Sequence, residues 1–124
     1  MSKFVIRSVP SGFKFDLKAA NGQIIATSEV YTTKSICRKG VQSVRRNAPI
    51  AKLEDHTAES FTSATNPKFE LYRDKTGCFR FRLKARNGEI IAVSESYSSK
   101  AACENGIESV RKNAPDAETL EQLQ

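Results

Sequence analysis

The chain is poor in the residues that build reactive centres. Its 124 residues include no tryptophan, one histidine and three cysteines. No two cysteines have the Cys-x-x-Cys spacing and one histidine does not complete a typical zinc site, so no metal site is predicted. The phosphate-binding patterns G-x-G-x-x-G and G-x-x-x-x-G-K-[ST] are missing as well. We therefore predict no catalytic residue and no cofactor, and we expect a protein that is not an enzyme.

Long apolar runs are also missing. No stretch approaches the roughly 18 apolar residues of a membrane-spanning helix. The segment Met1–Arg7 has neither an apolar signal core nor a small-residue cleavage site. These observations predict a cytoplasmic protein without membrane association. The chain is 39% hydrophobic and 27% charged, which is typical of a globular protein with one domain or two small repeats sharing a core.

An internal duplication dominates the sequence. The segment Phe13–Pro49 aligns without gaps with Phe79–Pro115, and well over half of the aligned positions are identical. A repeat of this length is typical of one supersecondary unit that packs against its copy. The chain is therefore predicted to contain a first repeat (residues 1–55), a linker rich in Ser, Thr and Ala (56–66) that we expect to be mobile, and a second repeat (67–124).

The first part of each repeat has the pattern of β-strands. Apolar residues alternate with basic ones along Phe79–Ala85, and Phe13–Ala19 repeats this pattern with fewer charges. A period of two is typical of a strand with one buried face. Another strand is predicted before each of these, at Lys3–Ser8 and Lys68–Arg73. With the apolar run that follows, each repeat should contain three antiparallel strands.

An Asn-Gly pair separates the second and third predicted strands of each repeat. These pairs are Asn21-Gly22 and Asn87-Gly88. Asn and Gly tolerate positive φ better than other residues, so we expect two-residue hairpin turns with positive φ at both positions.

The spacing of apolar residues then changes to that of a helix. Apolar residues recur at intervals of four, three and four, at Cys37, Val41, Val44 and Ala48, and the second repeat matches them. This stripe predicts helices over residues 34–47 and 100–113, with Ser or Thr as the N-cap and a proline after each helix. Gly40 and Gly106 lie beside the stripe, and we expect a close approach of helix backbone to sheet there.

Together these motifs resemble the YegP-like family of small, uncharacterised bacterial proteins. The resemblance is carried by Lys68–Tyr72, Phe79–Ala85, Asn87–Ile91, Ser94–Cys103 and Asn105–Ala114. It implies an α+β fold of two tandem β-β-β-α-β repeats related by pseudo-two-fold symmetry. It further implies a single antiparallel sheet covered on one face by two helices, with Ala51–Glu54 and Ala117–Leu120 as strands exchanged between the repeats. The resemblance implies no activity and no cofactor.

The cysteines offer one functional alternative. Cys37 and Cys103 lie on the apolar helix stripe, where a cysteine packs as a small hydrophobic residue. Cys78 sits beside a turn and is predicted to be more exposed. The alternative is a thiol-based redox or small-molecule protein that uses Cys78 or Cys103. His56 lies in the linker without a predictable partner, so a catalytic Cys–His pair is not expected.

Basic residues carry the main functional signal. The formal charge is +6, and most of the excess lies in the first repeat. Six residues form the candidate polyanion-binding set: Arg80, Arg82, Lys84, Arg86, Arg38 and Arg45. They suggest a salt-sensitive surface that attracts the phosphates of nucleic acids. The alternative is a solvated surface on which Glu70, Glu89 and Glu95 pair with the cations across strands.

Two further patterns bear on the partner. Phe79 and Phe81 alternate with the arginines, so they should face the helices and cannot stack on bases. The first helix carries Lys34, Arg38, Lys39, Arg45 and Arg46 on its polar side. The second helix has Glu104 and Glu108 where the first has Arg38 and Gln42. One repeat can therefore supply a recognition face and the other a scaffold. We expect a non-enzymatic, monomeric binding or interaction module whose partner is a protein or, alternatively, a nucleic acid.

Overall fold

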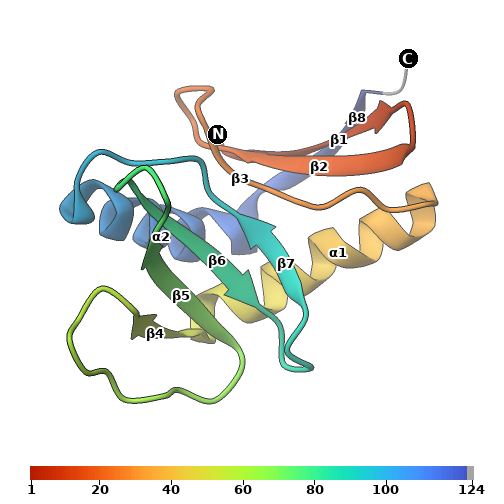
Figure 1. The fold of residues 1–124 in the computed structure, drawn as a ribbon. Coiled ribbons are helices and arrows are strands. Elements are labelled where there is room, and N and C mark those ends of the chain that lie inside the picture. Colours follow the sequence, from red (N-terminus) through yellow and green to blue (C-terminus); the bar gives the residue numbers. More distant parts are fainter. Residues whose placement is uncertain (123–124) are drawn as a thin grey trace.

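The computed structural model describes residues 1–122 and shows two helices packed on one eight-stranded sheet (Figure 1). In chain order the elements are β1 (Lys3–Val9), β2 (Gly12–Lys18), β3 (Ile24–Thr27), α1 (Lys34–Asn47), η1 (Ala48–Ile50), β4 (Lys52–Asp55), β5 (Lys68–Arg73), β6 (Phe79–Lys84), β7 (Ile90–Val93), α2 (Lys100–Asn113), η2 (Ala114–Asp116) and β8 (Glu118–Gln122). The last two residues of the predicted second repeat, 123 and 124, lie outside the described residues. No helix within residues 1–122 has the length and apolar character needed to cross a membrane.

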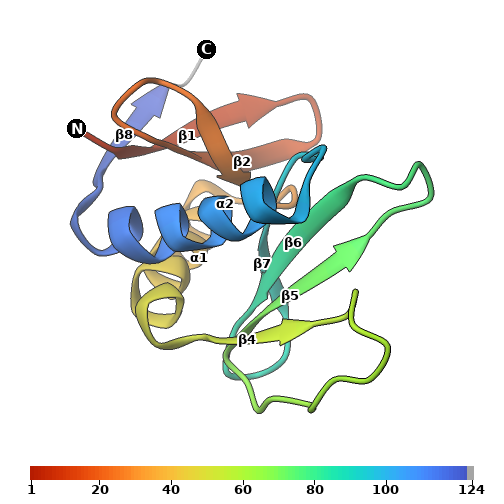
Figure 2. The ribbon, with the colours of Figure 1, turned by 90° about the vertical axis from the view of Figure 1, so that its left-hand side faces the viewer.

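The strands follow the order β4-β5-β6-β7-β3-β2-β1-β8. Counted inward from one edge the strands are β4, β5, β6 and β7, and from the other edge they are the equivalent strands β8, β1, β2 and β3. A pseudo-two-fold arrangement of the repeats requires this order. β4 of the first repeat pairs with β5, and β8 of the second repeat pairs with β1, so the final strand of each repeat lies against the other repeat (Figure 2). The exchange implied by the family resemblance is therefore present.

The expectation of a purely antiparallel sheet is wrong. Both exchanged strands run parallel to their neighbours, and the sheet is mixed. A parallel pair needs a crossover connection of about a dozen residues or more, and residues 56–67 supply it between β4 and β5. β8 reaches β1 from the end of α2, so no hairpin forces it to run antiparallel.

Both helices have the bounds that the sequence predicts. The hydroxyl of Thr33 accepts a hydrogen bond from the amide of Ile36, and the hydroxyl of Ser99 accepts one from the amide of Ala102. These side chains satisfy amide donors that the first helical turn leaves open. Each α-helix ends before its proline, and the chain continues through one 3₁₀ turn into the exchanged strand.

The hairpin turns at the Asn-Gly pairs differ from the predicted type. Positive φ occurs at Gly22 and Gly88, but at no non-glycine residue within residues 1–122. The amide of Gly22 donates to the carbonyl of Ala19, and the amide of Ala19 donates to the carbonyl of Gln23, both at 2.9 Å. This is a type I turn followed by a left-handed glycine, which closes a three-residue loop. Asn21 keeps negative φ because only the glycine position requires the left-handed region.

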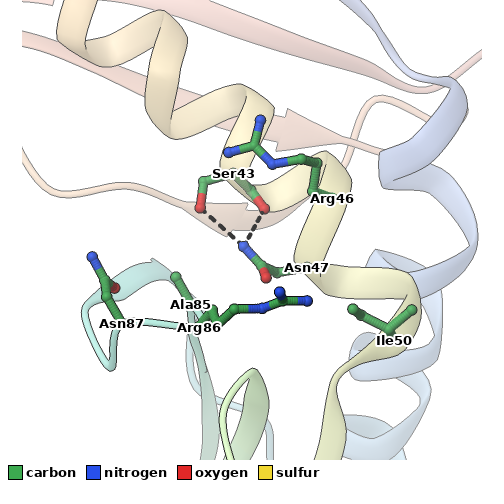
Figure 3. A pocket seen from close by; sticks show the side chains of 7 residues that line it. All are labelled: Ser43, Arg46, Asn47, Ile50, Ala85, Arg86 and Asn87. Atoms are coloured by element: carbon green, nitrogen blue, oxygen red, sulfur yellow. Dashed lines mark hydrogen bonds between the residues drawn. The ribbon is translucent and has the colours of Figure 1, made fainter.

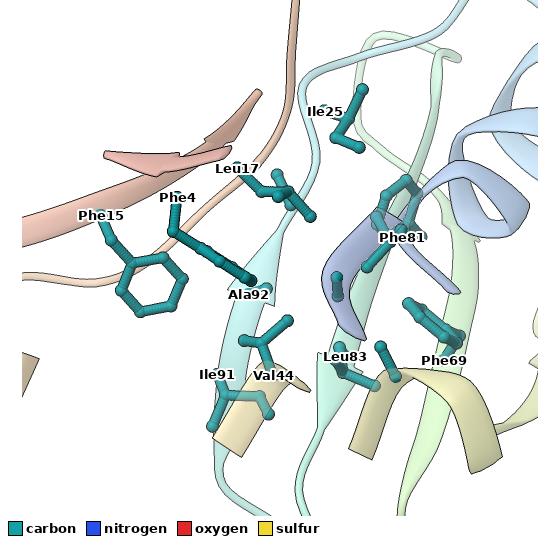
Figure 4. Packing of buried hydrophobic residues seen from close by; sticks show 14 of the residues in the cluster. Phe4, Phe15, Leu17, Ile25, Val44, Phe69, Phe81, Leu83, Ile91 and Ala92 are labelled. Atoms are coloured by element: carbon teal, nitrogen blue, oxygen red, sulfur yellow. The ribbon is translucent and has the colours of Figure 1, made fainter. Parts of the chain in front are cut away.

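The hydrophobic core lies between the two helices and one face of the sheet (Figure 4). The side chains of Phe4, Phe15, Phe69 and Phe81 are fully buried. The rings pair edge to face within each repeat, with centroids 5.8 Å apart in both repeats. Burying each ring contributes roughly 2–3 kcal/mol. Phe81 therefore faces the helices as predicted, and it is not available for stacking on bases.

Gly40 and Gly106 leave room for tyrosine side chains that lie against the helices. A Cβ on Gly40 would lie 2.7 Å from the hydroxyl oxygen of Tyr31 and 3.0 Å from the ring of Phe15. Gly106 meets Tyr97 in the same way. The helix therefore makes a close approach at each glycine, but to the side chains of a tyrosine and of a sheet phenylalanine rather than to the sheet backbone.

Candidate functional site

The basic ladder of β6 is engaged in ion pairs. Nε of Arg82 donates to Oε1 of Glu70 at 2.6 Å, and Nζ of Lys84 lies 3.2 Å from Oε2 of the same carboxylate. Nε of Arg80 donates to the carboxylate of Asp74 at 2.8 Å. With Arg38, whose partner is described below, four of the six predicted site residues therefore have carboxylate partners. Glu70 pairs across strands as the alternative interpretation proposed.

The carboxylates that face the ladder are strongly stabilised as anions. Burial alone would raise the pKa of Glu70, but hydrogen bonds from Arg82 and Lys84 lower it below its ordinary value. Hydrogen bonds from Thr76 and Arg80 hold the pKa of Asp74 far below its usual range. The two carboxylates thus offset most of the charge of Arg80, Arg82 and Lys84, and one net positive charge is left for an external polyanion.

The two predicted residues on α1 face the exchanged strand β8. Nη2 of Arg38 lies 2.6 Å from the carboxylate of Glu121. Arg45 donates to the carbonyl of Ala117 and, at 2.7 Å, to the hydroxyl of Thr119. These two cations hold β8 to α1. Their positions on the helix did not reveal this role, because the partners lie more than 70 residues away in the sequence.

A cluster that the sequence did not predict lies at the end of β4. Glu54, His56 and Glu70 place one metal-ligand atom each within 4.8 Å of one another. Nε2 of His56 lies 2.6 Å from Oε1 of Glu54, and Nζ of Lys68 lies 2.9 Å from Oε2 of Glu54 and 3.6 Å from Glu70. A divalent cation placed here would meet the Lys68 ammonium at short range. The chemistry of this donor set therefore fits an internal ion-pair network better than a metal centre.

The linker is folded onto this cluster. The amide of Ala64 donates to Oε2 of Glu54 at 2.6 Å, and the ring of Phe61 stacks on His56 with centroids 4.5 Å apart. Hydrogen bonds from Lys68, Ala64 and His56 lower the pKa of Glu54 to about 2. The segment expected to be a mobile tether thus has defined contacts, which arise because Glu54 and its partners come together only in the folded sheet.

The cysteines do not form a reactive centre. Cys37 and Cys103 are fully buried, as predicted, and burial raises the pKa of both thiols to about 11. They are protonated at neutral pH, whereas a nucleophilic cysteine acts as the thiolate. Cys78 is half-buried beside the β5–β6 turn.

A hollow surface lies where the last turns of α1 face the β6–β7 turn (Figure 3). The larger part has a volume of about 380 Å³ and is lined by Ser43, Arg46, Asn47, Ile50, Ala85, Arg86 and Asn87. A smaller part of about 160 Å³ shares three of these residues and extends along the helix past Lys39 to Ile36. We call the two parts together the α1 groove. Arg86 is a predicted site residue that lines it.

The α1 groove carries cations without carboxylate partners. Lys39, Arg46 and Arg86 are exposed, and none of them makes an ion pair within residues 1–122. A hollow on the outer face of α1, of about 410 Å³, is also lined by Lys39 and Arg46, together with Arg38. Lys39 and Arg46 were visible in the sequence as polar-face cations, but nothing in the sequence separated them from Arg45, which serves the fold.

Comparisons with known proteins agree with this architecture. A family model described as "Domain of unknown function (DUF1508)" matches residues 11–55 and 74–121, one segment in each repeat. A UPF0339 protein of Treponema denticola is 70% identical over 54 residues, which are 44% of this chain and 93% of that protein. The UPF0339 protein YegP of Yersinia pestis is 39% identical over 114 residues, covering 91% of this chain and 88% of its own.

The fold also matches a solved structure. The solution NMR structure of YegP from E. coli, described as a protein of unknown function, has a TM-score of 0.81 at 32% identity. The match covers 98% of this chain and 93% of that one.

Proposed function

The chain belongs to the DUF1508 family of uncharacterised UPF0339 and YegP proteins, and from this premise we propose that it is a non-enzymatic binding module for an anionic partner. We further propose that it acts in the cytoplasm as a monomer. The α1 groove is the binding surface in this proposal, rather than the β6 ladder named from the sequence.

The observation that carries the proposal is the difference between the two groups of cations. The ladder cations form ion pairs, Arg80 with Asp74, and Arg82 and Lys84 with Glu70. The cations of the α1 groove have no such partner, and they gather along one concave strip. Unneutralised charges beside a hollow surface attract an anionic partner and speed its association.

The side chains also support a binding role over a catalytic one. The thiols of Cys37 and Cys103 are buried and protonated, and the His56–Glu54 pair is engaged with Lys68 and the linker. In the described part of the chain, no hydrogen bond joins that histidine to a serine, threonine or cysteine. General acid–base chemistry needs such contacts to a reacting group.

The proposal is tested by fluorescence anisotropy with labelled polyanions. The probes are single- and double-stranded RNA and DNA oligonucleotides and an acidic peptide, each at about 50 and about 200 mM salt. We expect binding that weakens sharply as salt rises. The double variant Lys39→Glu/Arg46→Glu should weaken it at least tenfold.

Two controls locate the surface. Asn105→Glu/Lys112→Glu makes the matching changes on α2, and this variant should bind like the parent. Arg80→Glu/Arg82→Glu alters the ladder instead. If no probe binds at the lower salt, the proposed function is wrong. If the α1 and α2 variants lose affinity equally, the assignment of the α1 groove as the binding surface is wrong.

A further inference from the structure

We propose that the α1 groove binds an extended acidic segment of a partner protein in which carboxylates alternate with apolar side chains. The inference rests on the proposed function, because it names the chemical class of the anionic partner. Nucleic acid is the competing occupant, and the experiment below distinguishes the two.

The dimensions of the groove suit a short extended segment. Along α1 the groove runs from Ile36 to Asn47, and it continues to Ile50 in η1. With a rise of 1.5 Å per residue, the helical part is about 17 Å long. At about 3.3 Å per residue, this length accommodates roughly five residues of an extended chain.

The lining combines positive charge with apolar surface. Ile36 and Ile50 are 44% and 57% exposed, so large apolar side chains are accessible at both ends of the groove. The cations of Lys39, Arg46 and Arg86 lie between them, and Glu89 is the one acidic residue of the lining, so the cations of the groove exceed its acids by two. This lining can pair with carboxylates while it covers apolar side chains of the same ligand.

The lining is less suited to nucleic acid. Proteins that bind single strands stack bases on accessible aromatic rings. The one aromatic residue that lines the groove is Tyr31, and its ring stacks on Phe15 with centroids 6.3 Å apart while its hydroxyl lies against Gly40. The groove therefore has one aromatic ring, and that ring already packs on Phe15 and against α1.

Helix α1 already binds an acidic strand on its other flank. β8 runs from Glu118 to Gln122, and its Glu121 pairs with Arg38 at 2.6 Å and with Lys34 at 3.5 Å. Arg45 adds contacts to the β8 side, donating to Thr119 at 2.7 Å. The same helix surface chemistry thus holds an extended acidic segment within this molecule.

The duplication supplies an internal comparison. The duplication predicts an equivalent groove between α2 and the β2–β3 turn, which we call the α2 groove. Residues that shape the groove are the same in both copies: Ser43 and Ser109, Asn47 and Asn113, Ala85 and Ala19, Asn87 and Asn21. Residues that would contact the ligand differ: Lys39 is matched by Asn105, Arg86 by Ala20, Ile36 by Ala102 and Ile50 by Asp116. Lys112 still matches Arg46, so the differences between the copies remove two of the three cations and both apolar ends that the proposed ligand needs.

The experiment measures binding of a fluorescein-labelled peptide of about eight residues that alternates Glu and Ile. We expect one bound peptide per chain. Lys39→Asn/Arg86→Ala gives the α1 groove the residues of the α2 groove, and affinity should fall at least tenfold. The reverse triple variant, Ala20→Arg/Asn105→Lys/Asp116→Ile, should raise the stoichiometry from one to two. All these substitutions exchange exposed groove residues between copies of one fold, and urea unfolding checks that each variant remains folded.

The control probes separate the possible outcomes. A peptide with Gln in place of Glu should not bind, and an oligothymidylate of matched charge should bind more weakly than the acidic peptide. If the oligonucleotide binds and the acidic peptide does not, this inference is overturned while the proposed function stands. If neither binds, both are wrong. Peptide binding that survives Lys39→Asn/Arg86→Ala would also overturn the assignment of the groove.

Discussion

Arg45 and Arg111 occupy equivalent positions and perform the same task for opposite repeats. Each guanidinium carbon lies 5.3 Å from the centroid of a phenylalanine ring in the first strand of its own repeat, Phe4 for Arg45 and Phe69 for Arg111. Each also donates to the carbonyl just before the exchanged strand, at Ala117 and at Ala51. One side chain thus connects the core of one repeat to the strand supplied by the other.

Replacing either arginine should loosen the strand exchange. Arg45→Ala removes charge-assisted hydrogen bonds and the contact with Phe4, and we expect a loss of about 2–3 kcal/mol in the free energy of unfolding. Arg45→Lys should not restore it, because an ammonium cannot reproduce the planar donor geometry. Urea unfolding measures the change, with the exposed neighbour substitution Arg46→Ala as control. Equal stability of the two alanine variants would contradict the role given to Arg45.

Gly40→Ala should destabilise the protein although alanine favours helices. In an exposed helix this change stabilises by roughly 0.5–1 kcal/mol. Here the added methyl group would lie 2.7 Å from the Tyr31 hydroxyl oxygen, so we expect a net loss of about 1–3 kcal/mol. Adding Tyr31→Phe removes the nearest atom and should recover part of the loss. Additive effects of the two substitutions in thermal unfolding would show that the contact does not control stability.

Acid should destabilise the fold partly through Glu54. Its pKa is lowered from 4.5 to about 2 by Lys68, the Ala64 amide and His56. A carboxyl with a lowered pKa in the folded state stabilises the protein above its unfolded pKa, and this contribution is lost as pH falls from about 4.5 toward 2. Glu54→Gln should be less stable than the parent at pH 7 but lose less stability on acidification. Urea unfolding at pH 7 and pH 3 tests this, and equal acid sensitivity of both proteins would exclude the role.

Thiol labelling should separate the cysteines by burial. We expect Cys78 to react with a thiol reagent in the native protein, and Cys37 and Cys103 to react only after unfolding. The last two are fully buried, and burial raises their pKa to about 11. The native signal should disappear in Cys78→Ser. Rapid reaction of Cys103 in that folded variant would revive the thiol-based alternative.

The sequence predicted the fold well where local signals sufficed. Both helices begin and end where a hydroxyl N-cap and a proline delimit the apolar stripe, as at Thr33 and Pro49. The direction of β4 and β8 could not be predicted, because no hairpin joins them to their neighbours. The predicted turn type was wrong for a related reason. The Asn-Gly pattern is compatible with two loop lengths, and the backbone hydrogen bonds show which of them is formed.

The candidate site was less accessible to sequence reasoning. The cations were visible, but the acids that neutralise them come from other strands and turns, as Asp74 does for Arg80 and Glu121 for Arg38. Whether a basic residue is paired depends on tertiary neighbours, so alternation along a strand cannot identify a free one. Arg45 and Arg86 are the members of the predicted set without an ion pair within residues 1–122, but Arg45 donates to Ala117 and Thr119, so Arg86 is the one left for an external partner.

The strand exchange has a consequence for how this molecule can evolve. Two identical subunits that traded strands would carry every substitution twice, and both of their grooves would change together. In this chain the linker joins the two repeats covalently, so each repeat meets the strand of the other at an effective concentration set by the length of the linker. One half can therefore keep the residues that complete the sheet while the other acquires new surface chemistry, and a change in recognition need not be made twice.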